Sequence, residues 1–178
     1  AVGLALKDSL SNFAAGVLIA LFQPFRLGHY IEVAGANGTV MDVGMFNTTL
    51  LTPDNKRVVV PNRLVYNDTI VNYSAEDTRR IDMVFGIGYE DDVDLARKLI
   101  ESTIAADERV LADPATQVAV SELADSSVNF VVRPWVKKED YWGVRFVMME
   151  NIKRAFDENG ISIPYPQQDV HMHEVKAK

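Results

Sequence analysis

The chain has 178 residues, of which 48% are hydrophobic and 24% charged, a composition typical of folded domains. It contains no cysteine, which excludes disulfides, zinc–thiolate sites and thiol nucleophiles. The net charge is −7, and the acidic surplus falls within residues 81–178. This balance argues against a nucleic-acid partner, because binding phosphates requires a basic surface.

Residues 1–26 form the first predicted segment, which is helical and divided by the charged pair Lys7-Asp8. Neither half reaches the roughly 20 apolar residues that cross a bilayer. Apolar side chains recur every three or four positions in the second half, at Leu10, Phe13, Val17 and Leu21. This spacing predicts an amphipathic helix that lies on a membrane face or packs on protein, and Pro24 ends it. Because the sequence opens inside an apolar pattern, we expect further membrane segments before Ala1.

Small residues dominate the start of this segment. Gly3 and Ala5 flank Leu4, so copies of the helix could pack closely while Leu4 faces a shared axis. A ring of leucines there would make a hydrophobic constriction that blocks ions by dewetting. Spacing alone equally allows a buried helix in a soluble core.

Residues 27–80 are predicted to form a small β barrel, since short strands alternate with frequent turns. Turns are expected at residues 35–38 and 53–55, and a bulge or bend is expected at Gly44. A buried strand over residues 58–60 ends at Pro61-Asn62, and Thr69 to Tyr73 forms another strand.

Residues 81–165 alternate strand and helix, which predicts a two-layer α/β sandwich. Strands are expected over residues 81–87, 116–122 and 128–136. One helix starts at the acidic pair Asp91-Asp92 and runs to Ala106. A second helix carries the stripe Tyr141, Met148, Met149, Ile152 and Phe156, and Asn159-Gly160 closes it.

Residues 166–178 follow a Pro-rich turn and contain a predicted strand over residues 169–175. A lone strand has unpaired edges, so we expect it to pair with its copy in a neighbouring subunit. His171 and His173 share one face of this strand. They could hold a metal if copies accumulated in a ring, and are otherwise ordinary side chains facing a barrel.

Two further motifs lead to no site. Acidic residues fall at positions 1, 3, 5 and 12 of a calcium-loop pattern, at Glu90, Asp92, Asp94 and Glu101. The sixth position holds Leu95 where the loop requires glycine, so an acidic helix start is the better interpretation. Gly86-Ile87-Gly88 resembles a dinucleotide loop, but Asp91 at the third glycine position would repel a pyrophosphate. No arrangement of acid, base and nucleophile indicates an enzyme, and no cofactor is implied.

An ordered set of short motifs spans the whole chain. They are Gly3-Leu4-Ala5-Leu6, residues 9–16 (SLSNFAAG), Pro24-Phe25-Arg26 with Gly28, Gly38-Thr39-Val40, Thr48-Thr49-Leu50, Val60-Pro61-Asn62, residues 126–133 (SSVNFVVR) and residues 160–167 (GISIPYPQ). Each motif is weak alone, but the ordered set resembles the small-conductance mechanosensitive channel family, of MscS type.

The resemblance implies a membrane-protein fragment of α+β class that assembles as a homoheptamer in the bacterial inner membrane. Residues 1–26 would end a pore-lining transmembrane helix and continue as a kinked amphipathic helix. Residues 27–80 would form a Sm-like β domain, residues 81–165 an α/β domain around a vestibule, and residues 166–178 an intersubunit parallel β barrel. Everything from about residue 27 onward would be cytoplasmic.

The resemblance also implies roles for single residues. Leu4 falls on a pore-closing leucine, Gly16 on a kink glycine, and Asn12 on a residue that contacts the β domain near Pro61-Asn62. Two positions depart from the family pattern. Lys7-Asp8 replaces a familiar Gln-Gly, so Asp8 could cap the second half of the helix, and Arg63 replaces a familiar glycine.

The implied function is a channel that membrane tension opens, which releases ions and small osmolytes during hypo-osmotic shock. Its partners would be membrane lipid, further copies of the chain and the permeant solutes. A non-conducting oligomeric membrane scaffold and a soluble Sm-like binding module are the alternatives. A scaffold shares every sequence feature except the pore.

Overall fold

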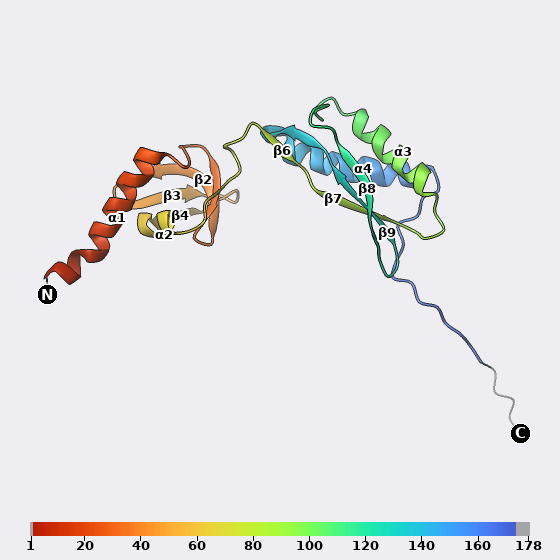
Figure 1. Ribbon diagram of the computed structural model, residues 1–178, viewed down its shortest axis with the longest axis horizontal. Helices are drawn as coiled ribbons and strands as arrows, with labels where there is room; N and C mark the ends of the chain where they lie inside the picture. Colours follow the sequence, from red (N-terminus) through yellow and green to blue (C-terminus); the bar gives the residue numbers. More distant parts are fainter. Residues whose placement is uncertain (1, 174–178) are drawn as a thin grey trace, which may run out of the picture. The chain divides into compact units, whose positions relative to one another are not determined.

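The computed structural model describes residues 2–173, and side chains from residue 6 onward. It divides into two compact units, Ala1–Asp77 and Thr78–Lys178 (Figure 1). Unit 1 holds the first helix together with a five-stranded sheet, and unit 2 holds a three-stranded sheet, a two-stranded sheet and two long helices.

The first helix, α1, runs from Val2 to Phe22 without interruption. The expected division at Lys7-Asp8 is not seen: α1 continues through both residues, and their side chains are exposed, as are those of Leu6, Ser9 and Leu10. Gln23, with φ of 46°, ends the helix just before Pro24. Among residues 2–173, no helix combines the length and apolar character needed to span a membrane.

The sheet of unit 1 is antiparallel throughout, with strand order β4-β3-β2-β1-β5. Its strands are β1 (Tyr30–Val33), β2 (Ala36–Val43), β3 (Asn47–Leu51), β4 (Arg57–Pro61) and β5 (Val71–Asn72). Within the described residues no pairing joins β4 to β5, so this sheet is open at these two strands, whereas a small barrel was predicted.

One predicted turn and one predicted bulge of unit 1 lie at other residues. The first turn is at Ala34-Gly35, where both residues have positive φ, and the following residues already pair in β2. The bulge lies between Val40 and Asp42, not at Gly44. Gly44 instead stands in the β2–β3 turn, where its N–H donates to the Asn47 carbonyl at 2.8 Å.

A short helix, α2 (Asn62–Asn67), follows β4 directly and was not predicted. It packs on α1 and contributes the fully buried Val65 to the core of unit 1. That core joins the end of α1 to one face of the sheet through Ile19, Phe25, Ile31, Val33, Val40, Leu50, Val60 and Val65.

Unit 2 is the predicted two-layer arrangement. Its three-stranded antiparallel sheet has the order β7-β9-β8. The elements are β6 (Thr78–Arg80), β7 (Met83–Ile87), α3 (Val93–Ala105), β8 (Gln117–Leu123), β9 (Val128–Arg133), β10 (Trp135–Lys137), a 3-10 turn η1 (Lys138–Asp140) and α4 (Tyr141–Glu158). The predicted strand over residues 128–136 is interrupted at Pro134, and β10 pairs with β6 instead.

The core of unit 2 lies between the sheet and the two helices. Alternate residues of β7 and β9 are buried, and they meet the apolar stripes of α3 and α4. Phe130, Ile100 and Met148 are fully buried at the centre. Side chains return to the same face every second residue in a strand and about every 3.6 residues in a helix, so the sequence shows which apolar residues share the buried face.

The ends of both helices follow local sequence signals. The Asp92 carboxylate accepts from Asp94 N at 2.8 Å and from Leu95 N at 3.1 Å, which caps α3 as the acidic-start interpretation requires. Asn159 and Gly160, with φ of 74° at the glycine, close α4 as predicted.

Residues 161–173 follow α4 as a C-terminal segment without helix or strand. Residues 169–173 of the predicted final strand pair with no other strand among residues 2–173, and residues 174–175 lie outside the described part. His171 and His173 are exposed, and the described residues contain no cluster of three potential metal ligands.

Candidate functional site

At Gly16 the backbone of α1 lies close against the β2–β3 turn and the start of α2. A Cβ atom added at Gly16 would lie 2.6 Å from Asn62 Nδ2 and 2.7 Å from the Met45 carbonyl oxygen. No side chain fits in that space, so only glycine allows α1 to approach this closely. The Met45 oxygen belongs to the backbone and the Asn62 amide is buried, so neither atom can easily move aside.

Asn62 is fully buried and uses each of its polar groups. Its Nδ2 donates to the Gly44 carbonyl at 2.9 Å, and its Oδ1 accepts from Thr48 Oγ1 at 2.9 Å. Its backbone N–H donates to the Phe46 carbonyl at 2.9 Å. A buried amide requires such partners, so Asn62 fixes the turn against which Gly16 packs.

Asn12 forms a second link, one turn earlier on α1. Its Oδ1 accepts from Arg63 N at 2.9 Å, and its Nδ2 donates to the Asp8 carbonyl at 2.9 Å. The first N–H groups of a helix have no partner within that helix, and Pro61 at the start of α2 has no side-chain cap. Asn12 thus caps α2 from a different helix.

The two faces of α1 differ sharply. Ala15 and Ile19 are buried against the β domain. The opposite face is apolar yet exposed, through Leu6, Leu10, Phe13, Val17 and Leu21. Phe13 extends this surface onto the β2–β3 turn, because its ring lies 6.4 Å from that of Phe46.

We call the contact made by Asn12, Gly16, Met45, Asn62 and Arg63 the helix–turn contact.

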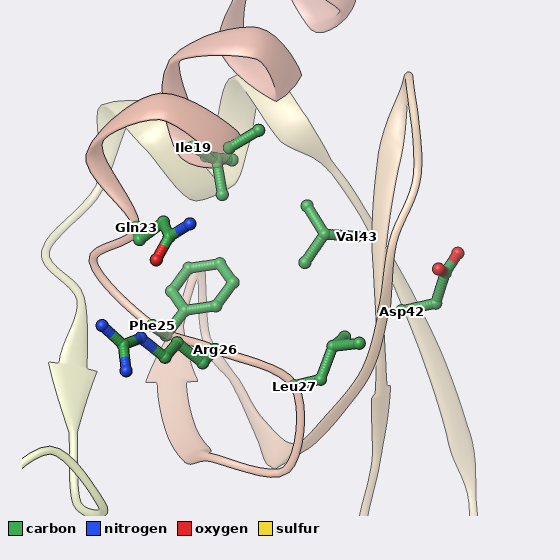
Figure 2. A pocket seen from close by; sticks show the side chains of 8 residues that line it. Ile19, Gln23, Phe25, Arg26, Leu27, Asp42 and Val43 are labelled. Carbon is green, nitrogen blue, oxygen red and sulfur yellow. The ribbon is translucent and has the colours of Figure 1, made fainter.

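An open groove of about 490 Å³ lies where α1 ends. Figure 2 shows Ile19, Phe25 and Val43 pointing into it from α1, from the following loop and from β2. Asp42 points away from the groove, as expected for neighbours on a strand. The lining of the groove is mainly apolar, which suits packing against another apolar surface better than it suits catalysis.

The predicted site residues fall into three groups. Asn12, Gly16 and Asn62 lie together at the helix–turn contact, with Pro61 at its edge and exposed. Lys7 and Asp8 are exposed on α1, which stays helical through them and through Gly16. The side chains of Gly3, Leu4 and Ala5 lie outside the described ones, so the role of Leu4 stays a prediction.

Sequence reasoning missed the two residues that hydrogen-bond the side chain of Asn62. Thr48 is fully buried on β3 and binds Asn62 from 14 positions away in the sequence. The available signal was the alternation of β3, which places Thr48 on the same buried face as Leu50. Gly44 was expected to bend a strand, but its carbonyl is the acceptor for Asn62.

Comparison with known protein families gives two matches in chain order. Residues 8–75 match the mechanosensitive ion channel β-domain, and residues 81–163 match the C-terminal domain of the mechanosensitive ion channel MscS. The helix–turn contact lies inside the first match.

Individual proteins agree with these matches. The chain is 50% identical over 179 residues to the small-conductance mechanosensitive channel of Edwardsiella ictaluri, and 39% identical over 171 residues to that of Helicobacter pylori. These alignments cover 100% and 96% of the chain, but 63% and 62% of the relatives. The chain therefore spans about six tenths of the length of the curated relatives it matches.

The solved structure of Helicobacter pylori MscS in its closed state superposes with a TM-score of 0.92 at 38% identity. The match covers 98% of this chain and 69% of that one. Such channels are membrane-associated proteins and are not enzymes. Together with both domain matches, this likeness over 98% of the chain shows that the chain belongs to the small-conductance mechanosensitive ion channel family, with an α+β fold made of its β domain and its C-terminal domain.

Proposed function

We propose that the protein is an ion channel that membrane tension opens, and that it releases ions and small osmolytes during hypo-osmotic shock. Tension favours whichever state has the larger in-plane area, so it shifts the population from closed to open. Membrane lipid supplies the force, and the permeant solutes are the cargo. No cofactor takes part.

The observation that carries this proposal is the helix–turn contact. It ties one face of α1 to the β domain through Gly16 and Asn12 while the apolar face remains exposed. A helix held in this way can couple an apolar environment on one side to a folded domain on the other. The same contact lies within a region that matches the β domain of known channels.

The pore would form where copies of the first helix meet. In this proposal Gly3 and Ala5 allow close packing, and Leu4 supplies a hydrophobic ring that dewets when closed. The α1 helix, continuous here, would kink near Lys7-Asp8 or Gly16 as the pore changes state. Seven copies would surround the axis in the bacterial inner membrane, with residues from about 27 onward in the cytoplasm.

The C-terminal segments of the copies would pair as a parallel β barrel around that axis. Residues 169–173 have no strand partner in the described part of the chain, and an extended segment with free backbone groups suits pairing with its copies.

Patch-clamp recording from liposomes that contain the protein, with its native flanking sequence, tests the function. Suction should evoke stepwise currents that close when suction is released. Native mass measurement of the detergent-solubilised protein tests the assembly separately. An oligomer that conducts at no suction short of membrane rupture would instead be the non-conducting scaffold.

A further inference from the structure

One carboxylate oxygen of unit 2 holds the start of the C-terminal segment. Asp91 Oδ2 accepts from Gly88 N at 2.8 Å, from Ser162 N at 2.8 Å and from Ser162 Oγ at 2.7 Å. Hydrogen bonds to an ionised acceptor are stronger than those between neutral groups. Ser162 is bound through both its backbone and its side chain, which fixes its orientation. We call Gly88, Asp91 and Ser162 the Asp91 clasp.

The backbone at Gly88 is shaped for this contact. A Cβ atom there would lie 2.6 Å from Ser162 Oγ and 3.1 Å from Asp91 Oδ2. Gly88 N also approaches the Ser162 carbonyl oxygen at 3.3 Å. Any side chain at position 88 would push Ser162 away from the carboxylate, so the clasp depends on all three residues.

The clasp is continuous with further anchors on both sides. Ile161, directly before it, is buried in the core of unit 2. Five residues beyond it, Gln167 N donates to Ser126 Oγ in the β8–β9 turn at 3.0 Å. Tyr89 ties the clasp loop to the same turn, through its hydroxyl and the Ala124 carbonyl at 2.5 Å. Figure 1 shows the segment leaving unit 2 beside the tip of this hairpin.

Beyond Gln167 the segment has no such anchor. Within the described part of the chain, no hydrogen bond holds residues 168–173. Val170 and Met172 alternate with polar residues and are 77% and 91% exposed. An extended segment with free backbone groups and exposed apolar side chains needs a partner, and residues 2–173 provide none for it.

We propose that Asp91 is a positioning residue for assembly. By holding Ser162 it sets the direction in which the C-terminal segment leaves unit 2, and so brings residues 170–172 of neighbouring copies together. The partner is a second copy of this chain. This inference rests on the proposed oligomeric channel and adds the residue that aims its C-terminal strands.

Site-specific cross-linking tests the proposal cleanly because the sequence has no cysteine. A single Val170→Cys substitution in the membrane-embedded protein reports contact between copies under mild oxidation. Asp91→Ala is then added, with Asp94→Ala as a matched control. Asp94 is an exposed acidic residue in the first turn of α3, and its side chain takes no part in the clasp.

The parent should cross-link between copies, and Asp91→Ala should lower the yield about tenfold, as expected from losing charge-assisted hydrogen bonds. Asp94→Ala should leave the yield unchanged, and native mass should be the same for all three proteins. Hydrogen exchange gives a second readout: the Ser162 amide should exchange at least tenfold faster in Asp91→Ala, while amides of the β7–β9 ladder keep their protection.

Each contrary result has a distinct meaning. Equal cross-linking in the parent and in Asp91→Ala overturns the role of Asp91. An assembled parent that does not cross-link at position 170 overturns the meeting of the segments. A parent that is monomeric by native mass overturns the proposed assembled channel itself. Unchanged exchange at Ser162 in Asp91→Ala shows that the clasp does not hold the segment.

Discussion

Gly16 lies so close to Asn62 that a single added carbon atom on the glycine would stand 2.6 Å from the amide nitrogen of Asn62. The backbone of α1 therefore rests directly on a buried polar side chain. That side chain is itself held by Thr48 and by the Gly44 carbonyl. A displacement of either residue should therefore displace the other.

Gly16→Ala should separate α1 from the β2–β3 turn. Overpacking at a rigid contact costs about 1–3 kcal/mol, which exceeds the roughly 1 kcal/mol that alanine gains over glycine in a helix. Denaturant unfolding of the chain measures the net loss.

Gly143→Ala on α4 is the matched control for Gly16→Ala. There the added carbon would meet only the flexible guanidinium end of Arg109, at 3.3 Å. That variant should be neutral or slightly stabilised. Equal effects of the two substitutions would show that the close approach at Gly16 is unimportant.

Asn12→Ala should loosen the start of α2. The variant removes the acceptor for Arg63 N, and a hydrogen bond of this kind contributes about 1 kcal/mol. The Arg63 amide should therefore exchange several-fold faster with solvent. Asn12→Asp keeps an oxygen acceptor and should restore protection, whereas exposed Ser9→Ala on the same helix should change nothing. Unaltered Arg63 exchange in Asn12→Ala would disprove the cap.

Thr48 and Asn62 should behave as one unit in a double-mutant cycle. Asn62→Ala leaves the Thr48 hydroxyl and the Gly44 carbonyl without their partner, at a cost of about 1–3 kcal/mol. Thr48→Val removes the hydroxyl and keeps the shape. The two losses of unfolding free energy should be non-additive by about 0.5–3 kcal/mol, and strict additivity would exclude a working hydrogen bond between them.

The features predicted well from sequence are local ones. Asp92 caps α3 through residues two and three positions away, and Gly160 ends α4 through its own φ. The two-layer form of unit 2 follows from alternating burial in β7 and β9 against helical stripes. Each signal is contained within a few neighbouring residues, so the sequence displays it directly.

The features predicted wrongly depend on distant partners or on context. Whether β4 pairs with β5 is decided by packing between segments remote in sequence, so the open sheet could not be foreseen. The six residues of α2 are too few for a periodic pattern, and the helix is completed by Asn12 from α1. The charged pair Lys7-Asp8 suggested a division of α1, but exposed charges do not interrupt a helix, and α1 runs through both residues.

Arg109→Gln should raise the pKa of Asp107. The Arg109 guanidinium makes a bidentate pair with this carboxylate, with Nε to Oδ1 at 2.9 Å and Nη2 to Oδ2 at 2.7 Å. Its hydrogen bonds hold the pKa of Asp107 below the ordinary value, against partial burial, which acts in the opposite direction.

The sign of the resulting pH dependence follows from this lowered pKa. The pair stabilises the fold above the ordinary pKa of aspartate, about 3.9, and the gain is lost as the pH falls through the lowered value. Arg109→Gln should therefore flatten the acid limb of the stability curve, and carboxyl NMR shifts should show Asp107 titrating at higher pH. Exposed Lys98→Gln is the charge-matched control. Identical Asp107 titration in all three proteins would contradict the pairing.

Leu4→Ser tests the proposed gate itself. A hydrophobic constriction excludes water because wetting apolar walls is unfavourable, and a ring of hydroxyl groups removes that barrier. The variant should open at lower suction and leak at rest, while Leu4→Ile, which stays apolar, should keep the threshold of the parent. Patch recordings compare the three proteins under the same lipid and suction protocol. If Leu4→Ser kept both the threshold and the resting conductance of the parent, the constriction would have to lie elsewhere along the pore. If Leu4→Ile changed the threshold as Leu4→Ser does, the cause would be packing between helices and not wetting of the constriction.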